Sequence, residues 1–302
     1  MKDERGFALI ITLLITSLLV ALTIEFVDEV FVDTSARHNF VEAQQASFLA
    51  ESGITGGIKL LQITLANQSF SSLLDPWARP LEIDDETGHI SVTMEDESSK
   101  LNFNQIFGPT GKPAFPVNFD IATRLLKNLG LSPDLLDALA DWVDSDEDPH
   151  PAGAESAYYA TLKPPYKVKN ARLDTIEELA LVKGFNGALV RQLRPYITIY
   201  SDMPGTININ TAPQGVIAAL DDRMTDSLTK QVLDYRKTTP FQYPADLAKV
   251  PGMETIALGL STSTTTKGTV YRIVSQATVG ETTRIIEAVV RIDGIVLYWR
   301  EY

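Results

Sequence analysis

The stretch "DWVDSDEDPHPAGAESAYY", residues 141–159, carries side chains whose types and spacing suggest chemistry. Seven carboxylates and one histidine, His150, fall between Asp137 and Glu155. Like charges at this density need either water or a cation around them. Three interpretations are therefore open: a metal site, a carboxylate pair for acid–base catalysis, and an acidic loop that is only solvated.

A metal site is the first interpretation. Four of the carboxylates occupy positions 1, 3, 5 and 12 of an EF-hand calcium loop, in which alternating aspartates converge on one ion and the last glutamate binds through both oxygens. Pro149 stands where that loop has its glycine, so we expect different loop geometry. Hard oxygen ligands favour calcium over zinc or copper. The predicted ligands are Asp144, Asp146, Asp148 and Glu155, with Asp141, one helical turn after Asp137, as an additional one.

Aromatic residues lie at both ends of the acidic stretch. Trp142 precedes it, and Tyr158 and Tyr159 follow it. Large aromatic side chains bury much apolar surface, so we expect them to anchor both ends of the loop in the core. A bare acidic run is usually just solvated. Anchored ends and alternating aspartates favour the metal site over that alternative.

Catalysis is the weakest interpretation. The chain has three histidines, His38, His89 and His150, and no cysteine. It contains no H-E-x-x-H, no G-x-S-x-G, no P-loop and no Rossmann glycine pattern. The sequence therefore predicts a protein that is not an enzyme. With 39 acidic and 26 basic residues the net charge is −13, which also disfavours nucleic acid as a partner.

The N-terminal segment predicts one long helix that is half in a membrane. Residues 7–24 carry no charge, and eighteen such residues nearly span a bilayer as a helix. The preceding residues are not cationic overall and no cleavage site of a secretory signal closes the run. Apolar residues then recur with helical spacing among charged ones, without Pro or Gly until Gly53. We expect a transmembrane half at 7–28 and a solvent-exposed half at 29–66.

Strand patterns occur in two separate places. "HISVTMED" (89–96) alternates apolar and polar residues and then turns through "SSK" into "LNFNQI", which predicts a hairpin. Residues 69–85 read as a connector. At the C-terminus, 268–280, 282–293 and 294–302 predict an antiparallel meander. We assign 67–104 and 268–302 to one sheet and 105–267 to a helical domain inserted in it.

The helical region contains an internal repeat. "LNFNQI", "LLDALADW" and "IEELALVKG" recur in order as "ININTA", "LTKQVLDY" and "PADLAKVPG", which indicates two divergent copies. The acidic stretch lies in extra residues of the first copy. Each copy ends in a segment like a helix-hairpin-helix, whose glycine turn can bind phosphate with help from Lys183 and Arg191, or from Lys249 beside Glu254. The net charge favours helix packing over DNA binding.

The N-terminus resembles the processing signal of type IV pilins and pseudopilins. A short charged leader ends in "RG" and is followed at once by "FALIITLLITSLLVAL". The resemblance implies that residues 1–6 are a leader, that a prepilin peptidase cuts between Gly6 and Phe7, and that Phe7 is methylated. Most members have Glu as the fifth mature residue, where this chain has Ile11. A buried carboxylate without a partner is costly, so its absence suits a subunit at the filament tip.

Over nearly its whole length the chain resembles the K-type minor pseudopilins of the type II secretion system. The resemblance rests on "DWVDSDEDPHPAGAESAYY", "KLNFNQI", "LDTIEELALVKGF" and "TININTAPQGV". It implies an α+β, pilin-like fold, with a long transmembrane helix packed on an antiparallel sheet and an inserted all-helical domain that binds calcium.

The same resemblance implies an inner-membrane protein with a single span and a periplasmic head. Such proteins cap the pseudopilus together with I-type and J-type minor pseudopilins and help to initiate its assembly. Their further partners are the major pseudopilin, the prepilin peptidase and the inner-membrane assembly platform. The alternative is a membrane-anchored helix-hairpin-helix protein that binds DNA in an uptake machinery.

Overall fold

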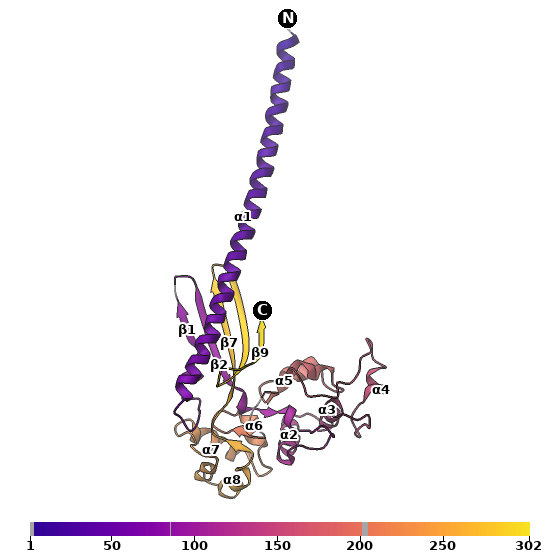
Figure 1. Ribbon diagram of the computed structural model, residues 1–302, viewed down its shortest axis with the longest axis vertical. Helices are drawn as coiled ribbons and strands as arrows, with labels where there is room; N and C mark the ends of the chain where they lie inside the picture. Colours follow the sequence, from indigo (N-terminus) through magenta and orange to yellow (C-terminus); the bar gives the residue numbers. More distant parts are fainter. Residues whose placement is uncertain (1–2, 85, 201–204) are drawn as a thin grey trace.

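The computed structural model describes residues 3–84, 86–200 and 205–302. A single long helix, α1 (Asp3–Leu65), begins at one extreme of the molecule and ends against a sheet, and a helical unit lies beyond the sheet (Figure 1). The C-terminus lies beside α1, far from the N-terminus (Figure 1).

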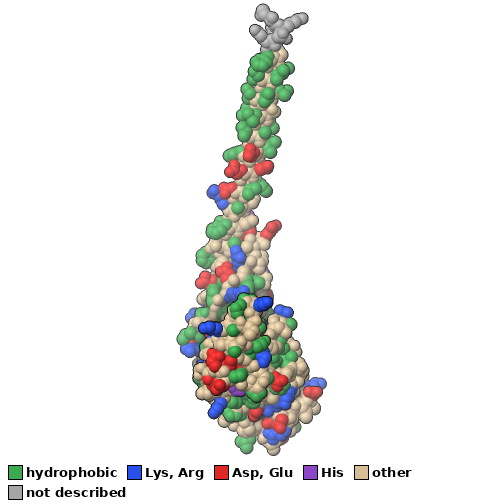
Figure 2. Space-filling model, turned by 90° about the vertical axis from the view of Figure 1, so that its right-hand side faces the viewer, with side chains coloured by type: hydrophobic (Ala, Val, Ile, Leu, Met, Phe, Trp, Pro, Cys, Tyr) green, Lys and Arg blue, Asp and Glu red, His purple; other side chains and the backbone are tan. Residues whose placement is uncertain are grey.

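Helix α1 changes character along its length. Its first half stands free of the rest of the chain, with hydrophobic side chains on the outside that give way to acidic ones (Figure 2). Within the described residues, it is the only helix long and apolar enough to cross a membrane. Further along, Ala46, Ala50, Ile54 and Leu61 are buried against the sheet. The first two residues of the predicted leader lie outside the described part of the chain.

Two glycines allow α1 to lie close to the sheet. A Cβ atom on Gly53 would lie 2.1 Å from Oγ of Ser275, and one on Gly57 would lie 3.1 Å from a methyl group of Ile273. The helix continues through both positions to Leu65. Glycine usually weakens a helix interior. At these two positions the absence of a side chain lets the helix approach the sheet closely.

The sheet has five antiparallel strands in the order β1-β2-β7-β8-β9. The C-terminal meander is confirmed, and the sheet is divided in sequence between β2 and β7, which gives the predicted α+β arrangement. The predicted connector is partly wrong because it contains β1, whose alternating "LEID" pairs with β2. The strands are β1 (Leu81–Asp84), β2 (His89–Asp96), β7 (Val270–Val279), β8 (Thr282–Arg291) and β9 (Val296–Glu301).

The predicted hairpin after β2 is wrong. A short 3-10 helix, η2 (Glu97–Ser99), follows β2, and β3 (Leu101–Asn102) then pairs in parallel with β4 (Ile197–Thr198). Leu101 and Phe103 are buried in the core of the helical unit rather than under the sheet. The N-terminal part of the sheet unit therefore ends near residue 100 and not at 104. Burial of these apolar side chains decides which strand this segment pairs with.

The helical unit contains two segments with the same order of elements. The first begins at β3 and ends at β4, and the second begins at β5 (Ile207–Asn208) and ends at β6 (Thr264–Thr265), which pairs with β5 in parallel. Gly184 and Gly252, the turn glycines of the two helix-hairpin-helix-like segments, both have positive φ, 84° and 86°. The first segment holds η3 (Phe103–Gln105), α2 (Pro116–Asn128), α3 (Leu135–Val143), α4 (Ser156–Tyr159), η4 (Ile176–Leu181) and α5 (Gly187–Leu193), and the second holds α6 (Gln214–Ala219), α7 (Asp226–Arg236), η5 (Pro244–Lys249) and α8 (Glu254–Leu260).

Candidate metal centre

The acidic loop connects α3 to α4 at the outer edge of the helical unit (Figure 1). It begins where α3 ends, since Asp144 is the C-cap residue and its N–H still donates to the carbonyl of Ala140 at 2.9 Å. Ser145 donates its N–H and its hydroxyl to the carbonyl of Pro109, each at 3.0 Å. These bonds fix the start of the loop against the segment that follows β3.

Three of the predicted ligands converge. Asp144, Asp146 and Glu155 each offer a carboxylate oxygen, and these atoms lie within 4.8 Å of one another. Asp144 is 1% exposed and Glu155 is 5% exposed. Three carboxylates at this separation repel one another strongly unless a cation lies between them.

Unpaired oxygen atoms show that the cluster fits a cation. Within the described residues, Oδ1 of Asp144 and both carboxylate oxygens of Glu155 are buried and accept no hydrogen bond. A buried carboxylate without a donor carries a large desolvation penalty. A calcium ion accepts six to eight oxygen ligands of this kind. These oxygens are therefore ones that a hard cation could coordinate.

A second group shares Asp144 with the first. Asp141, Asp144 and His150 also offer ligand atoms within 4.8 Å of one another. Asp141 is fully buried, accepts the backbone N–H of His150 at 3.0 Å, and lies 2.5 Å from Nδ1 of the same residue. Asp141 therefore holds the middle of the loop through His150, whether or not it also binds an ion.

The carboxyl groups of the cluster hold protons more tightly than usual. Burial, reinforced by the neighbouring carboxylates, raises the pKa of Asp144 to about 6 and that of Glu155 to about 7. Both causes act against the charged form. A cation bound between these carboxylates would favour their charged forms, so its binding would release protons.

The structure leaves the predicted ligand Asp148 out of both groups. Its side chain is exposed, and its backbone N–H donates to the carboxylate of Asp146 at 3.0 Å. Pro149 disfavours helical backbone at the residue before it, which is consistent with the position of Asp148 outside both groups. The EF-hand spacing therefore grouped Asp148 with carboxylates that the structure does not place beside it.

Aromatic anchoring of the loop is confirmed for two of three residues. Trp142 is 3% exposed and Tyr159 is fully buried, and their rings pack edge to face with centroids 5.3 Å apart. Tyr158 is 39% exposed, so its predicted burial is wrong. Its ring instead faces the ammonium group of Lys183 at 5.3 Å.

Lys183 serves the acidic loop. Its ammonium group donates to the carbonyl of Gly153 at 2.7 Å, and its backbone N–H donates to the hydroxyl of Tyr159 at 3.1 Å. In the second hairpin, Lys249 forms an ion pair with Asp246 at 2.9 Å. The two lysines considered for phosphate binding are thus already engaged, which weighs against the DNA-binding alternative.

Two glycines belong to the site although the sequence analysis passed over them. A Cβ atom on Gly153 would lie 1.9 Å from Oδ2 of Asp141, and one on Gly111, which has φ +66°, would lie 2.4 Å from Oδ2 of Asp144. The "PAG" string was the available signal for Gly153. No local pattern connects Gly111 with a loop more than thirty residues away.

Substitution of Gly153 by Ala is expected to weaken calcium binding by about tenfold or more. The new methyl group would displace the carboxylate of Asp141, and a shifted supporting shell typically lowers metal affinity about 10- to 100-fold. Isothermal titration with calcium measures the change. Gly259→Ala is the control because no atom lies within 4 Å of its added Cβ; equal losses in both variants would contradict this account.

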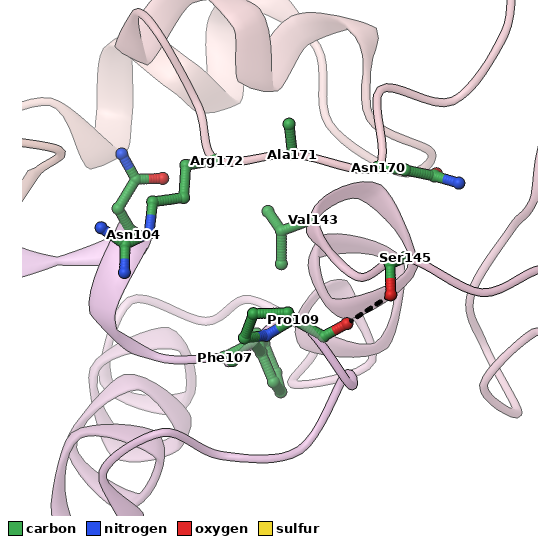
Figure 3. A pocket seen from close by; sticks show the side chains of 9 residues that line it. Asn104, Phe107, Pro109, Val143, Ser145, Asn170, Ala171 and Arg172 are labelled. Atoms are coloured by element: carbon green, nitrogen blue, oxygen red, sulfur yellow. Dashed lines mark hydrogen bonds between the residues drawn. The ribbon is translucent and has the colours of Figure 1, made fainter.

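A small cavity borders the loop without entering the cluster. It has a volume of about 140 Å³ and lies between the segment after β3, the end of α3 and residues 170–172. Its lining includes Val143, Ser145, Asn170 and Arg172, and the bond from Ser145 to Pro109 closes one side (Figure 3). The lining contains no carboxylate, so this cavity shares no candidate ligand with the acidic cluster.

Calcium binding is expected to strengthen between pH 5 and pH 7.5. The raised pKa values of Asp144 and Glu155 mean that the folded, calcium-free chain binds protons more tightly than the unfolded chain. Its stability should therefore fall as pH rises from about 4 to about 7. Calcium should offset that loss.

The measurement is the difference in melting temperature with and without calcium at several pH values. Taking the difference removes groups outside the site, such as Asp96, whose pKa is also raised to about 6 by burial. A difference that stays constant with pH would contradict the proton–metal exchange.

Comparison with known proteins gives a consistent family. Two profiles described as "Type II secretion system (T2SS), protein K" match residues 99–202 and 207–267, which coincide with the two segments of the helical unit. Type II secretion system protein K of Klebsiella pneumoniae is 31% identical over 265 residues, covering 83% of this chain and 81% of the relative. The protein of the same name from Pectobacterium carotovorum is 30% identical, covering 77% and 75%.

A solved structure has the same fold. It is a chain from the crystal structure of the GspK–GspI–GspJ complex of the type 2 secretion system of enterotoxigenic Escherichia coli. The TM-score is 0.70 at 24% identity, and the match covers 89% of this chain and 99% of that one. At 24% identity, the match shows that the two chains share the pilin-like fold with its helical unit.

Proposed function

The chain belongs to the protein K family of the type II secretion system, and from this premise we propose that it is a non-enzymatic minor pseudopilin that caps the pseudopilus. It helps to initiate assembly of the filament that exports folded proteins across the outer membrane. Its neighbours in the tip are the I-type and J-type minor pseudopilins, as in the complex of its structural relative. The major pseudopilin and the inner-membrane assembly platform are its further partners.

The position of the helical unit is the observation that carries the proposal. The unit lies beyond the C-terminal end of α1, on the side away from the N-terminus (Figure 1). A filament of pilin-like subunits grows by stacking heads along parallel helices. A head enlarged at its far end leaves no room for a further subunit above it, so one copy at the tip is the natural stoichiometry.

The membrane half of α1 supports the same position. Gly6 and Phe7 form the processing site for the prepilin peptidase, and Phe7 carries the methylated terminus after cleavage. Ile11 replaces the usual carboxylate, which would need a partner from an adjacent subunit. The chain then crosses the inner membrane once and places its head in the periplasm.

Introduction of Glu at Ile11 is expected to reduce pseudopilus initiation several-fold. A charged side chain costs about 2.5 to 3.5 kcal/mol at the centre of a membrane helix and less toward the end, where Ile11 lies in the apolar run 7–24. A tip subunit also has no neighbour above to neutralise the charge. The measurement is the number of pseudopili per cell, counted by immunofluorescence. Ile11→Leu keeps the position apolar and should behave like the natural chain; wild-type pseudopilus numbers with Ile11→Glu would remove this argument for the tip.

Calcium has a structural role in this proposal. When bound, it would neutralise the carboxylates of Asp144, Asp146 and Glu155, which come from both ends of the loop between α3 and α4. The chain itself supplies the rest of the loop's support through His150, Lys183 and the buried aromatic rings. The ion therefore stabilises one edge of the helical unit and takes no part in a reaction.

A further inference from the structure

A pocket at the opposite end of the helical unit has a chemistry that the capping role leaves unexplained. Its volume is about 340 Å³, at the lower end of the range for ligand pockets. It lies between the connector that follows α1 and the helix α7. Leu73 and Leu74 come from the connector and are 53% and 50% exposed, and Leu233 of α7 also lines the pocket.

Arg236 is a cation without a counter-charge in this pocket. Its guanidinium group donates to the carbonyl of Ile209 at 2.7 Å, and no carboxylate among the described residues lies within 4 Å of it. Burial alone lowers its pKa to about 10. The adjacent Lys237 is exposed and yet is paired with Asp234 at 2.7 Å. The better-buried cation is thus the unpaired one.

Two other arginines of intermediate burial show how such a guanidinium group can be satisfied within the chain. Arg272, which is comparably buried, has the carboxylates of Glu97 and Glu287 beside it. Arg124 has no acidic partner but donates two nitrogens to the last carbonyls of α6. Arg236 makes one such bond, lines the pocket, and donates from its side chain to no other residue that the structure describes. A guanidinium fork with free donors matches a carboxylate.

A second donor lies on the same wall. Gln214, the first residue of α6, lines the pocket, and its exposed side chain makes no hydrogen bond to any residue that the structure describes. Asn210 also lines the pocket, but its amide is fully used by the carbonyls of Phe241 and Thr266 and the N–H of Phe241. The pocket thus combines a guanidinium, one free amide and three leucines.

We propose that this pocket receives an aspartate or glutamate side chain, flanked by an aliphatic residue, from a neighbouring pseudopilin of the tip complex. The carboxylate binds Arg236 and Gln214, and the aliphatic residue packs on Leu73 and Leu74. Charge complementarity selects the carboxylate. The inference rests on the proposed assembly with I-type and J-type pseudopilins, whose helices would lie along α1, and the pocket opens where the chain leaves that helix.

The test is calorimetric titration of the detergent-solubilised full-length chain with a co-purified I-type and J-type pair. Arg236→Gln is expected to weaken binding by about 30-fold or more, because it removes the charged partner of a desolvated carboxylate. Leu74→Glu should weaken binding comparably by placing a like charge in the pocket. Lys230→Gln, an exposed change of equal charge on the same helix, should alter the dissociation constant less than about twofold.

The two pocket variants and the unmodified chain together distinguish failure of the pocket assignment from failure of the proposed assembly. Arg236 also bonds to the carbonyl of Ile209, so Arg236→Gln could unfold the chain. Leu74 lies on the exposed connector and makes no such bond, so Leu74→Glu tests the pocket independently. Natural affinity in both pocket variants would overturn the pocket assignment and leave the capping proposal standing. If the unmodified chain does not bind the pair at all, the proposed assembly fails and the pocket assignment falls with it.

Discussion

Calcium at a hundred times its dissociation constant is expected to stabilise the folded chain by about 2.7 kcal/mol. For a chain of 302 residues that corresponds to a rise in melting temperature of roughly 4 °C. The reason is that Asp144 and Glu155 keep buried oxygens without donors, so the calcium-free fold bears a penalty that the ion removes. Near-ultraviolet circular dichroism is a suitable measurement, because Trp142 and Tyr159 pack together beside the loop.

Substitution of Asp144 by Asn is expected to abolish the response to calcium without destabilising the calcium-free chain. The variant removes a buried, repelled charge, so the calcium-free chain should be as stable as the natural one or more stable, while its response to calcium disappears. If Asp144 only packed in the core, the substitution would destabilise the calcium-free chain and leave its response to calcium unchanged. Asp148→Asn is the matched control and should keep the full response, because its side chain is exposed and outside both clusters. A melting temperature that ignores calcium in the natural chain would end the metal proposal.

The sequence predicted which carboxylates come together better than it predicted the path of the loop that carries them. Alternating aspartates followed by a distant glutamate identified Asp144, Asp146 and Glu155, which the fold brings within 4.8 Å. It could not exclude Asp148, whose direction depends on backbone set by Pro149. It also could not predict that His150 would hold Asp141, since a hydrogen bond across a loop depends on the path of the whole chain.

The fold was predictable where patterns are local. The apolar run and its periodic continuation specified α1, and alternating strands with glycine turns specified the C-terminal meander. The predicted hairpin failed because "LNFNQI" satisfies a strand pattern equally well in either unit. Its actual partner, Ile197–Thr198, lies about a hundred residues away, and burial of Leu101 in the helical core makes that choice.

Glu97 joins the sheet to the helical unit. It is fully buried, and its carboxylate accepts bonds from Nζ of Lys100 at 3.0 Å and from Nε of Arg272, on β7, at 2.7 Å. It also accepts a bond from the hydroxyl of Thr198, on β4 in the helical unit. Burial acts to raise the pKa of Glu97, but Lys100 and Arg272 outweigh it and hold the pKa below its usual value. The carboxylate therefore stays charged and keeps two buried cations neutralised.

Substitution of Glu97 by Gln is expected to destabilise the chain by about 2 kcal/mol or more, because it removes the carboxylate that Lys100 and Arg272 share and leaves them only Glu95 and Glu287 as acidic partners. Denaturant unfolding measures the change. Glu95→Gln is the control, since Glu95 also lies 2.9 Å from Nζ of Lys100 but is 53% exposed, and its loss should be under about 1 kcal/mol. The stability due to Glu97 should also disappear as pH falls through its lowered pKa. Equal effects of the two substitutions would show that the buried carboxylate does not hold the two units together.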